Sequence, residues 1–395
     1  MKTTIATALA HGSAHEVAEL LGQAVREQLR GVLPAFTAVF ASTKQPLGEL
    51  LPALKRHVGS APLVGASTAG EFTAAGDAKG SAVVFAVAGD FRVFAGMAAG
   101  LRADVEGAVA AAARSLPATV DGYPHCTTVL LLDPLAGKGE EAVLIAAALL
   151  GQHVRLAGGA AGDDLQMTQT LCGLDAAVAS DAIVLASIFS KQPLGVGVCH
   201  GHLPISGPLR VTRAEGNVVH EIEGRPAWDV WAEQTRERAA ARGVDPLHLA
   251  PEEVGPFLLR YEAGLAAGST YKIRAPLSRS DDGALGFACG IPEGSVIRIT
   301  ESEEDRQISS AREAARRALA QAGGGEMAGA LVFDCICRNL ILGPRFAAAV
   351  RSISAELGGA PVAGFETYGE IALDVGDMSG FHNTTTVVLA FPEGE

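Results

Sequence analysis

The stretch PLVGASTAGEF at 62–72 places two glycines around a short polar turn, with Glu71 directly after the second glycine. Near the other end of the chain, PVAGFETYGEI at 361–371 repeats this turn with Glu370 in the same place. A third version, RLAGGAAGDDL at 155–165, is one residue shorter and carries Asp163 as its carboxylate. The three turns predict an internal repeat, which decides how the rest of the chain is divided.

Each turn belongs to a longer unit with an apolar strand ahead of it: FTAVFAS at 36–42, TTVLLLD at 127–133 and GALVFDC at 329–335. Alanine- and leucine-rich segments with helical spacing flank each strand, and a further apolar strand follows each turn. Continuously apolar strands that alternate with helices are typical of sheets covered by helices. The predicted fold class is therefore α/β with α+β elements in the middle, built from repeated α-β-α-turn-β modules that form helix-covered sheets.

The chain has 395 residues, which is long for a single core. We expect an N-terminal domain over residues 1–205 that contains two module copies, and a C-terminal domain over 206–395. The second domain is expected to hold a β-hairpin-rich segment at 206–300 and the third copy at 301–395. The two halves are thus predicted to differ by an insertion.

The hairpin-rich segment has its own signals. Alternating residues flank Glu215-Gly216-Asn217, which predicts a hairpin, and Pro226 is placed to begin a helix. Further on, LGFACGIPEGSVIRIT at 285–300 predicts a second pair of strands around its Pro-Glu-Gly turn.

Composition excludes several classes of protein. The net charge of -13 opposes nucleic-acid binding, which depends on Lys and Arg neutralising phosphates. No stretch approaches the roughly 20 apolar residues that span a bilayer, and AVLIAAALL at 142–150 predicts a buried helix instead. The N-terminus lacks a convincing signal-peptide core, and the six cysteines form no Cys-x-x-Cys pair. We expect a cytoplasmic protein with reduced thiols and no membrane insertion.

The glycine turns do not match two enzymatic templates. A phosphate-binding loop needs Lys and then Ser or Thr after its second glycine, where this chain has a carboxylate. The hydrolase motif Gly-x-Ser-x-Gly is one residue shorter than the turn at 65–70. Two interpretations remain: the acids cap the next element, or the turns line a ligand site.

Polar groups gather in the third turn, where Glu366 and Tyr368 lie close in sequence to His382 and Asn383. At the end of the third predicted strand, the guanidinium of Arg338 could clamp a carboxylate. The candidate ligand-binding residues are Ser67, Thr68, Glu71, Asp163, Arg338, Glu366, Tyr368, Glu370, His382 and Asn383.

The cluster Cys199-His200-Gly201-His202 offers thiol and imidazole ligands. Strand alternation would put His200 and His202 on one face and Cys199 on the other. Two histidines are too few for a structural zinc site, whereas a haem needs only one axial histidine.

Several of these motifs together resemble the FIST sensory module, in both its N-terminal and its C-terminal halves. They are PLVGASTAGE, GGAAGDD, DCICRN, GFETYGEI and FHNTTTVVLAF, and the likeness runs from about residue 30 to 391. The resemblance implies an intracellular input domain of bacterial signal transduction that binds small ligands, with amino acids the usual suggestion, and that is not an enzyme. Some members of the family are haem proteins that sense nitric oxide and regulate a histidine kinase or a cyclic-di-GMP enzyme.

Our leading hypothesis is a non-enzymatic, cytoplasmic sensor of small ligands such as amino acids or related metabolites. The alternative is a haem-based nitric-oxide sensor with His200 or His202 as axial ligand, and an enzyme that uses the paired acids or Ser67 is a third. Because the chain ends at Glu395, we expect a separate signalling protein, such as a histidine kinase or cyclic-di-GMP enzyme, to receive the signal. A homodimer is left open.

Overall fold

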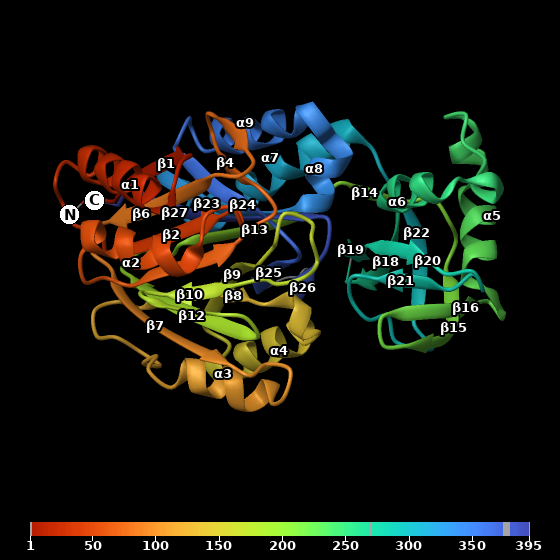
Figure 1. Cartoon of the computed structure of the whole chain (residues 1–395), viewed down its shortest axis with the longest axis horizontal. Coiled ribbons are helices and arrows are strands. Elements are labelled where there is room, and N and C mark those ends of the chain that lie inside the picture. The colour runs from red at the N-terminus through yellow and green to blue at the C-terminus, as the bar shows by residue number, and fades with distance from the viewer. Residues whose placement is uncertain (1, 269, 374–379, 395) are drawn as a thin grey trace.

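The computed structural model of the chain describes residues 2–268, 270–373 and 380–394. Figure 1 shows three sheets packed together with helices around them, and a separate body with its own sheet beside them. The three packed sheets have six strands each, and the separate body is built on a nine-stranded sheet. This mixed content of helix-covered sheets, in two halves, confirms the predicted fold class.

The first module adds one strand at its start and a small hairpin after its turn to the predicted pattern. Its first helix begins with a capping box, in which Ser13 and Glu16 satisfy each other's backbone amides. Its elements are β1 (Thr4–Ala10), α1 (Ala14–Gln28), β2 (Phe36–Ala41), α2 (Leu47–Val58), β3 (Leu63–Ser67), β4 (Glu71–Thr73), β5 (Gly76–Ala78) and β6 (Ala82–Ala88).

The second module repeats this order. Its elements are β7 (Arg92–Ala99), α3 (Val105–Ala113), β8 (His125–Leu132), η1 (Pro134–Ala136), α4 (Gly139–Leu150), β9 (Val154–Ala160), β10 (Cys172–Leu174), β11 (Ala177–Ala179) and β12 (Ala182–Ser190).

The third module is interrupted after its first strand by the separate body. Its elements are β13 (Gly195–His200), α7 (Glu304–Gln321), β23 (Met327–Cys335), α8 (Ile336–Leu342), η3 (Gly343–Arg345), α9 (Phe346–Glu356), β24 (Val362–Thr367), β25 (Glu370–Leu373), β26 (Gly380–His382) and β27 (Thr385–Pro392). The division of the chain at 205/206 into two domains stays a prediction.

The three modules exchange their hairpins in a cycle. In each module a parallel strand pair (β2–β3, β8–β9 or β23–β24) forms the centre of a sheet. The hairpin β4–β5 of the first module joins the sheet of the third, where β4 pairs with β24. The hairpin of the third module joins the second through β25 and β9, and that of the second joins the first through β10 and β3. Each sheet is therefore completed by a neighbour.

A shared core lies between the inner faces of the three sheets. Phe40, Leu131 and Phe333 come from the central strand of each sheet, and all are fully buried in one cluster. The outer faces carry separate apolar layers under α1 and α2, α3 and α4, and α7 and α9. Strands buried on both faces explain why the sequence shows continuous apolar runs instead of alternation.

The first glycine of each turn is required by the approach of the parallel strands. A Cβ atom on Gly158 would lie 1.9 Å from the carbonyl oxygen of Leu130, and one on Gly364 would lie 2.0 Å from that of Val332. Any side chain there would push the two strands apart. This glycine is therefore structural in at least these two modules.

The helix predicted at 142–150 is present as part of α4, but its expected burial is wrong. Leu144 and Leu149 are 60% and 52% exposed, because α4 covers its sheet with the smaller residues Ala142, Val143 and Ala146. Among the described residues, no helix combines the length and apolar character needed to cross a membrane.

The separate body contains the predicted hairpin around residues 215–217 and a helix that starts after Pro226. The predicted second hairpin at 285–300 is wrong: both strands form, but β21 pairs with β16 and β20, whereas β22 pairs with β14, β15 and β18. The elements are β14 (His202–Pro204), β15 (Leu209–Glu215), β16 (Val218–Ile222), β17 (Arg225–Pro226), α5 (Ala227–Ala240), η2 (Pro246–His248), α6 (Pro251–Arg260), β18 (Tyr261–Ala267), β19 (Thr270–Arg274), β20 (Pro276–Arg279), β21 (Leu285–Phe287) and β22 (Val296–Ser302).

Candidate functional site

The three glycine turns meet at the carboxyl ends of the parallel strands and form a closed ring. Each turn donates a backbone N–H to a carbonyl oxygen of another turn: Ala69 to Glu366 at 3.1 Å, Tyr368 to Ala160 at 3.2 Å, and Gly162 to Ser67 at 2.8 Å. The ring follows the same cycle as the hairpin exchange. It brings together candidate residues that lie far apart in the sequence.

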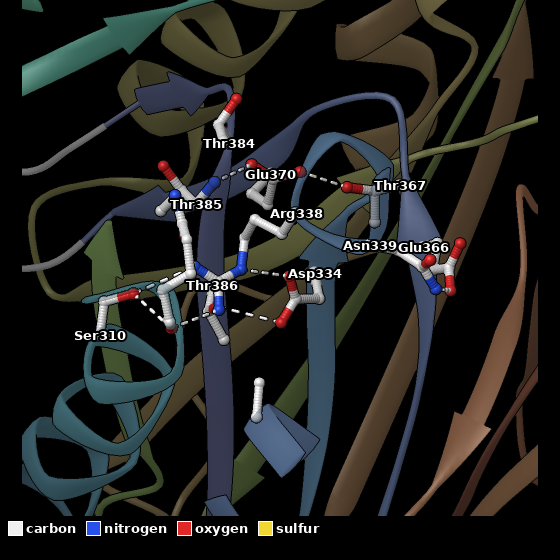
Figure 2. A network of polar contacts seen from close by, with 12 residues as sticks. Ser310, Asp334, Arg338, Asn339, Glu366, Thr367, Glu370, Thr384, Thr385 and Thr386 are labelled. Carbon is white, nitrogen blue, oxygen red and sulfur yellow. Dashed lines mark hydrogen bonds and ion pairs between the residues drawn. The ribbon is translucent and has the colours of Figure 1, made fainter. Parts of the chain in front are cut away.

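The first and third turns hold their glutamates in the same way. The Thr68 hydroxyl donates to one carboxylate oxygen of Glu71, and the Ser81 backbone N–H donates to the other at 3.2 Å. In the third turn, the Thr367 hydroxyl donates to one carboxylate oxygen of Glu370, and the Thr385 backbone N–H donates to the other at 3.1 Å (Figure 2). Both carboxyl groups thus tie the turn to the strand that follows the hairpin.

Burial controls the protonation of these two acids. Both glutamates are fully buried. Loss of solvation raises the pKa of Glu71 to about 7, against the opposing effect of its hydrogen bonds, and raises the pKa of Glu370 well above its usual range. Neither site therefore behaves as an ordinary surface carboxylate near neutral pH.

The middle turn departs from the other two, and the alignment of Asp163 with the two glutamates is wrong. In the strand pairing, Cys172 of β10 is opposite Ala66 of β3, and Glu370 of β25 is opposite Gly159 of β9. These are corresponding places, so Cys172 is the counterpart of Glu370. The residues between Ala161 and Cys172 form a loop ahead of the hairpin, so the middle turn is longer than the others. Sequence spacing aligned Asp163 with the two glutamates because the inserted loop shifts the hairpin further along the sequence.

Asp163 instead organises this loop. Its carboxylate accepts hydrogen bonds from the backbone N–H groups of Met167 at 2.9 Å and Gln169 at 3.0 Å, and from the Tyr368 hydroxyl at 2.6 Å. Burial acts to raise the pKa of Asp163, but these hydrogen bonds outweigh it and lower the pKa overall. Two predicted site residues, Asp163 and Tyr368, are therefore in direct contact.

Arg338 is fully buried and forms an internal ion pair (Figure 2). Its Nε lies 2.6 Å from Oδ1 of Asp334, and its Nη1 lies 3.0 Å from the Ser310 hydroxyl. Gln307 accepts further hydrogen bonds from the guanidinium through both its side-chain and backbone oxygens. A ligand carboxylate would have to share Arg338 with Asp334, so this residue's contact with a ligand stays a prediction.

Asp334 also distinguishes the third module from the second. Asp334 pairs with Glu366 across the parallel strands, and Leu132 pairs with Ala160 at the corresponding place. The second module therefore has an apolar side chain where the third has a buried charge.

Glu366 lies beside the ring with one oxygen unsatisfied. Asn339 donates to Oε1, as Figure 2 shows, while Oε2 is buried and finds no hydrogen-bond partner in the described part of the chain. Burial raises the pKa of Glu366 to about 8. The second glycine of the first turn, Gly70, is packed against this carboxyl group: a Cβ there would lie 2.6 Å from Glu366 Cδ.

His382 and Asn383 lie where the ring meets the separate body. His382 pairs with Glu370 between β25 and β26, and within the described residues neither of its ring nitrogens has a partner at hydrogen-bond geometry. Burial lowers its pKa to about 3, so the imidazole is neutral. The Asn383 side-chain oxygen accepts from the Ala275 backbone N–H at 3.3 Å, which links the two bodies.

Ser67 has a structural role at the edge of the ring. Its hydroxyl accepts a hydrogen bond from the Leu171 backbone N–H at 2.8 Å, and its backbone N–H donates to the Leu171 carbonyl at 2.9 Å. The residue thereby fixes the end of the loop that separates Gly162 from the second hairpin.

Sequence reasoning missed Glu262, which approaches the same junction from the separate body. The Thr384 hydroxyl donates to its Oε1 at 2.8 Å, and none of the described residues is a hydrogen-bond partner of its Oε2. Burial raises the pKa of Glu262 well above its usual range, with the nearby Glu370 adding to the effect. One signal was available: Glu262 is the single charged residue of the otherwise apolar strand YEAGLAA.

The two candidate haem ligands do not fit a haem in this arrangement. His200 Nε2 lies 2.9 Å from the Tyr271 carbonyl oxygen, and its Nδ1 accepts from the His202 backbone N–H. His202 is only 3% exposed, and its Nε2 faces Glu262 Oε2 at 3.8 Å. An axial position on His202 would therefore require the buried carboxylate of Glu262 to move aside. Burial lowers the pKa of both imidazoles, which keeps them in the neutral form.

Comparison with known proteins identifies the two halves. A model of the FIST N domain matches residues 35–225, and a model of the FIST C domain matches residues 227–373. The uncharacterized protein MJ1623 of Methanocaldococcus jannaschii is 26% identical over 163 residues, which are 40% of this chain and 31% of that protein. The match thus spans about a third of the relative's length. FIST domains are sensory domains of signal transduction proteins. The chain therefore belongs to the FIST family, with both FIST domains present in order.

Proposed function

We propose that this protein is a non-enzymatic sensor in which a small ligand, such as an amino acid or a related metabolite, binds where the ring of turns meets the separate body. Among the described residues, the observation that carries the proposal is a set of buried polar atoms without hydrogen-bond partners: Glu262 Oε2 and both ring nitrogens of His382 at this junction, and Glu366 Oε2 beside the ring. Such atoms are rare in folded proteins because each one costs free energy. A ligand that supplies donors and acceptors would satisfy them.

The position of this junction also supports ligand binding. In open α/β sheets, ligands bind outside the carboxyl ends of the parallel strands, where loops from different units converge. Here the three turns converge at those ends, and Thr384 and Asn383 connect them to the separate body. A ligand that binds between the bodies would change how they pack, and a partner protein could respond to that change.

The test is a ligand screen by thermal stabilisation with a library of amino acids and related metabolites, using the full chain. Binding to the folded state alone raises the unfolding temperature. A hit is expected to lose most of its effect in Glu366→Gln and Tyr368→Phe, while Glu19→Gln on the exposed face of α1 serves as the control. If native mass spectrometry and the screen both show no bound small molecule, the proposal is wrong.

The haem alternative has less support, because the described surroundings of His200 and His202 do not fit a haem as they stand. If a haem were bound, His202 would be the residue to hold it, and the haem would supply an iron centre for nitric oxide. Protein purified from haem-supplemented cells would then show a Soret band that disappears in His202→Ala and persists in His220→Ala. A colourless protein that fails to titrate with haem excludes this alternative.

We further propose a cytoplasmic location and a separate signalling partner, such as a histidine kinase or a cyclic-di-GMP enzyme, with a homodimer as one arrangement. The sensory role of FIST domains supports an output of this kind. The check is the autophosphorylation rate of a histidine kinase encoded beside this chain, measured with and without the protein. An unchanged rate at every ligand concentration argues against that partner.

A further inference from the structure

A cavity of about 570 Å³ lies at the seam between the separate body and the second module. The hairpin β18–β19 and the segment 290–295 form its walls, and Glu140 of α4 reaches it from the three-sheet body. Pockets for small ligands generally measure about 300–1,000 Å³. The size therefore suits a metabolite, and the cavity contains none of the ten candidate residues predicted from sequence.

Two cations and one carboxylate line the described part of this cavity. Arg274 is 1% exposed, and its Nη2 lies 2.6 Å from Glu140 Oε1. Lys272 Nζ lies 3.6 Å from the same oxygen. Among the described residues of the lining, one carboxylate therefore serves both cations, and the positive charge is in excess.

The buried guanidinium is also incompletely paired. Its Nη1 donates to the Phe381 carbonyl oxygen at 3.1 Å, but its Nε has no hydrogen-bond partner among the residues that the structure describes. Burial and the charge of Arg274 lower the pKa of Lys272, against the opposing effect of Glu140. A bound anion would relieve both conditions, because it would add a second negative charge and an acceptor.

The remaining walls are mostly apolar and include Leu265, Ala266, Ala267, Ile291 and Pro292, with Ser295 as a polar exception. From the charged end and the apolar walls together, we infer that the seam cavity binds a small carboxylate with an aliphatic body. The carboxylate would lie against Lys272 and Arg274. An ammonium group on the ligand is accommodated by Glu140 but is not required.

The cavity offers a route from binding to signalling, and this step rests on the proposed sensory function. Arg274 belongs to β19 of the separate body, yet it contacts Phe381 in β26 and Glu140 in α4. These contacts cross the seam. A carboxylate that competes with Glu140 for Arg274 would loosen the attachment of the separate body to the second sheet.

The experiment is isothermal titration calorimetry of the full chain with three probes that share one branched aliphatic body. They are 4-methylpentanoate, which carries only the carboxylate, L-leucine, which carries both charges, and 3-methylbutylamine, which carries only the ammonium. We expect the first two to bind and the amine not to bind. Absence of binding by 4-methylpentanoate to the folded protein overturns the inference.

Variants then locate the binding. Lys272→Met is expected to weaken both carboxylates by about tenfold, the usual effect of removing a charged hydrogen-bond donor. The matched control is Lys138→Met, in which the exposed Lys138 is paired with Glu141 outside the cavity, and it should change affinity by less than about twofold. Glu140→Gln should tighten 4-methylpentanoate and weaken L-leucine relative to it, a reversal that general damage to the protein would not produce.

Arg274→Gln is the second cationic variant, with circular dichroism as the check on folding. If Lys272→Met folds and leaves carboxylate binding unchanged, the seam cavity is not the site, while the sensory proposal stands on the binding itself. If another metabolite binds but none of the three probes does, the carboxylate inference fails and the sensory proposal again survives.

Discussion

The first and third turns share the backbone ring with the middle turn but differ from it in their buried side chains. All three take part in the same ring of backbone hydrogen bonds, although only the outer two carry a buried glutamate held by a threonine. The middle turn has Cys172 in the corresponding strand position. The ring therefore forms without the acids. In the two modules that carry them, the fold tolerates the free-energy cost of burying a carboxyl group.

The largest expected effect tests the difference between Asp334 and Leu132. Asp334→Leu would leave Arg338 buried without its carboxylate and should lower the free energy of unfolding by about 3–5 kcal/mol. The double variant Asp334→Leu with Arg338→Met imitates the apolar second module and should recover most of that loss. Chemical denaturation followed by circular dichroism measures both. A single variant as stable as the double would show that the pair is not coupled.

The second prediction moves an acid into the middle turn. Ala161 and Ala182 occupy the places that Thr68 and Ser81 have around Glu71 in the first module. Cys172→Glu should destabilise the protein by about 2–3 kcal/mol, because these alanines offer no hydroxyl groups to the new carboxyl group. Adding Ala161→Thr and Ala182→Ser rebuilds the arrangement seen around Glu71 and should restore at least half of the stability. Cys172→Met is the control for size, measured in the same denaturation experiment. A triple variant no better than Cys172→Glu would contradict the equivalence of the turns.

The third prediction concerns pH. Because burial raises the pKa of Glu71 to about 7, its contribution to stability is complete below about pH 4.5 and is lost as the pH rises through 7. From pH 5 to pH 8, the free energy of unfolding should fall by about 2 kcal/mol less in Glu71→Gln than in the parent protein. The free energy of unfolding at the two pH values measures this, with exposed Glu49→Gln as the control. Identical pH slopes for parent and Glu71→Gln would rule out the buried titration.

The smallest expected effect tests a contact that the third turn makes and the first turn lacks. Tyr368 donates its hydroxyl to Asp163 and accepts from the Leu165 backbone N–H at 2.7 Å, whereas the first turn has Ala69 at the corresponding place. Tyr368→Phe should cost about 1 kcal/mol and speed hydrogen exchange at the Leu165 amide. Unchanged exchange there would mean that the loop is held by Asp163 alone.

Much of the fold was accessible from sequence because it depends on short-range patterns. The apolar strands, their flanking helices and the three turns were visible as a repeat, since each buried strand must be apolar along its whole length. The leading strands and the hairpins were missed. The hairpin strands are only three residues long in cases such as β4 and β10, which is too short for periodicity to show.

The candidate site was predicted less completely. Glu366, Tyr368 and Glu370 are neighbours in one segment, but their side chains bind different partners, Asn339, Asp163 and Thr367. A shared ligand for these three residues stays a prediction. Arg338 was expected to face a ligand, but its pairing with Asp334 depends on a helical turn after β23 that sequence spacing did not predict. Glu262 and Arg274 were missed because they come from the separate body.

The sequence by itself determined that the chain folds into repeated helix-covered sheets with glycines at each turn, because burial and the close approach of parallel strands restrict the residues at those positions. Only the tertiary structure decided which turn contacts which, that Cys172 stands in for a glutamate, and that a charged cavity lies at the seam between the bodies. The physical reason is that pairing between modules is set by backbone hydrogen bonds, which any residue except proline can make. Such contacts leave no pattern of side chains in the sequence.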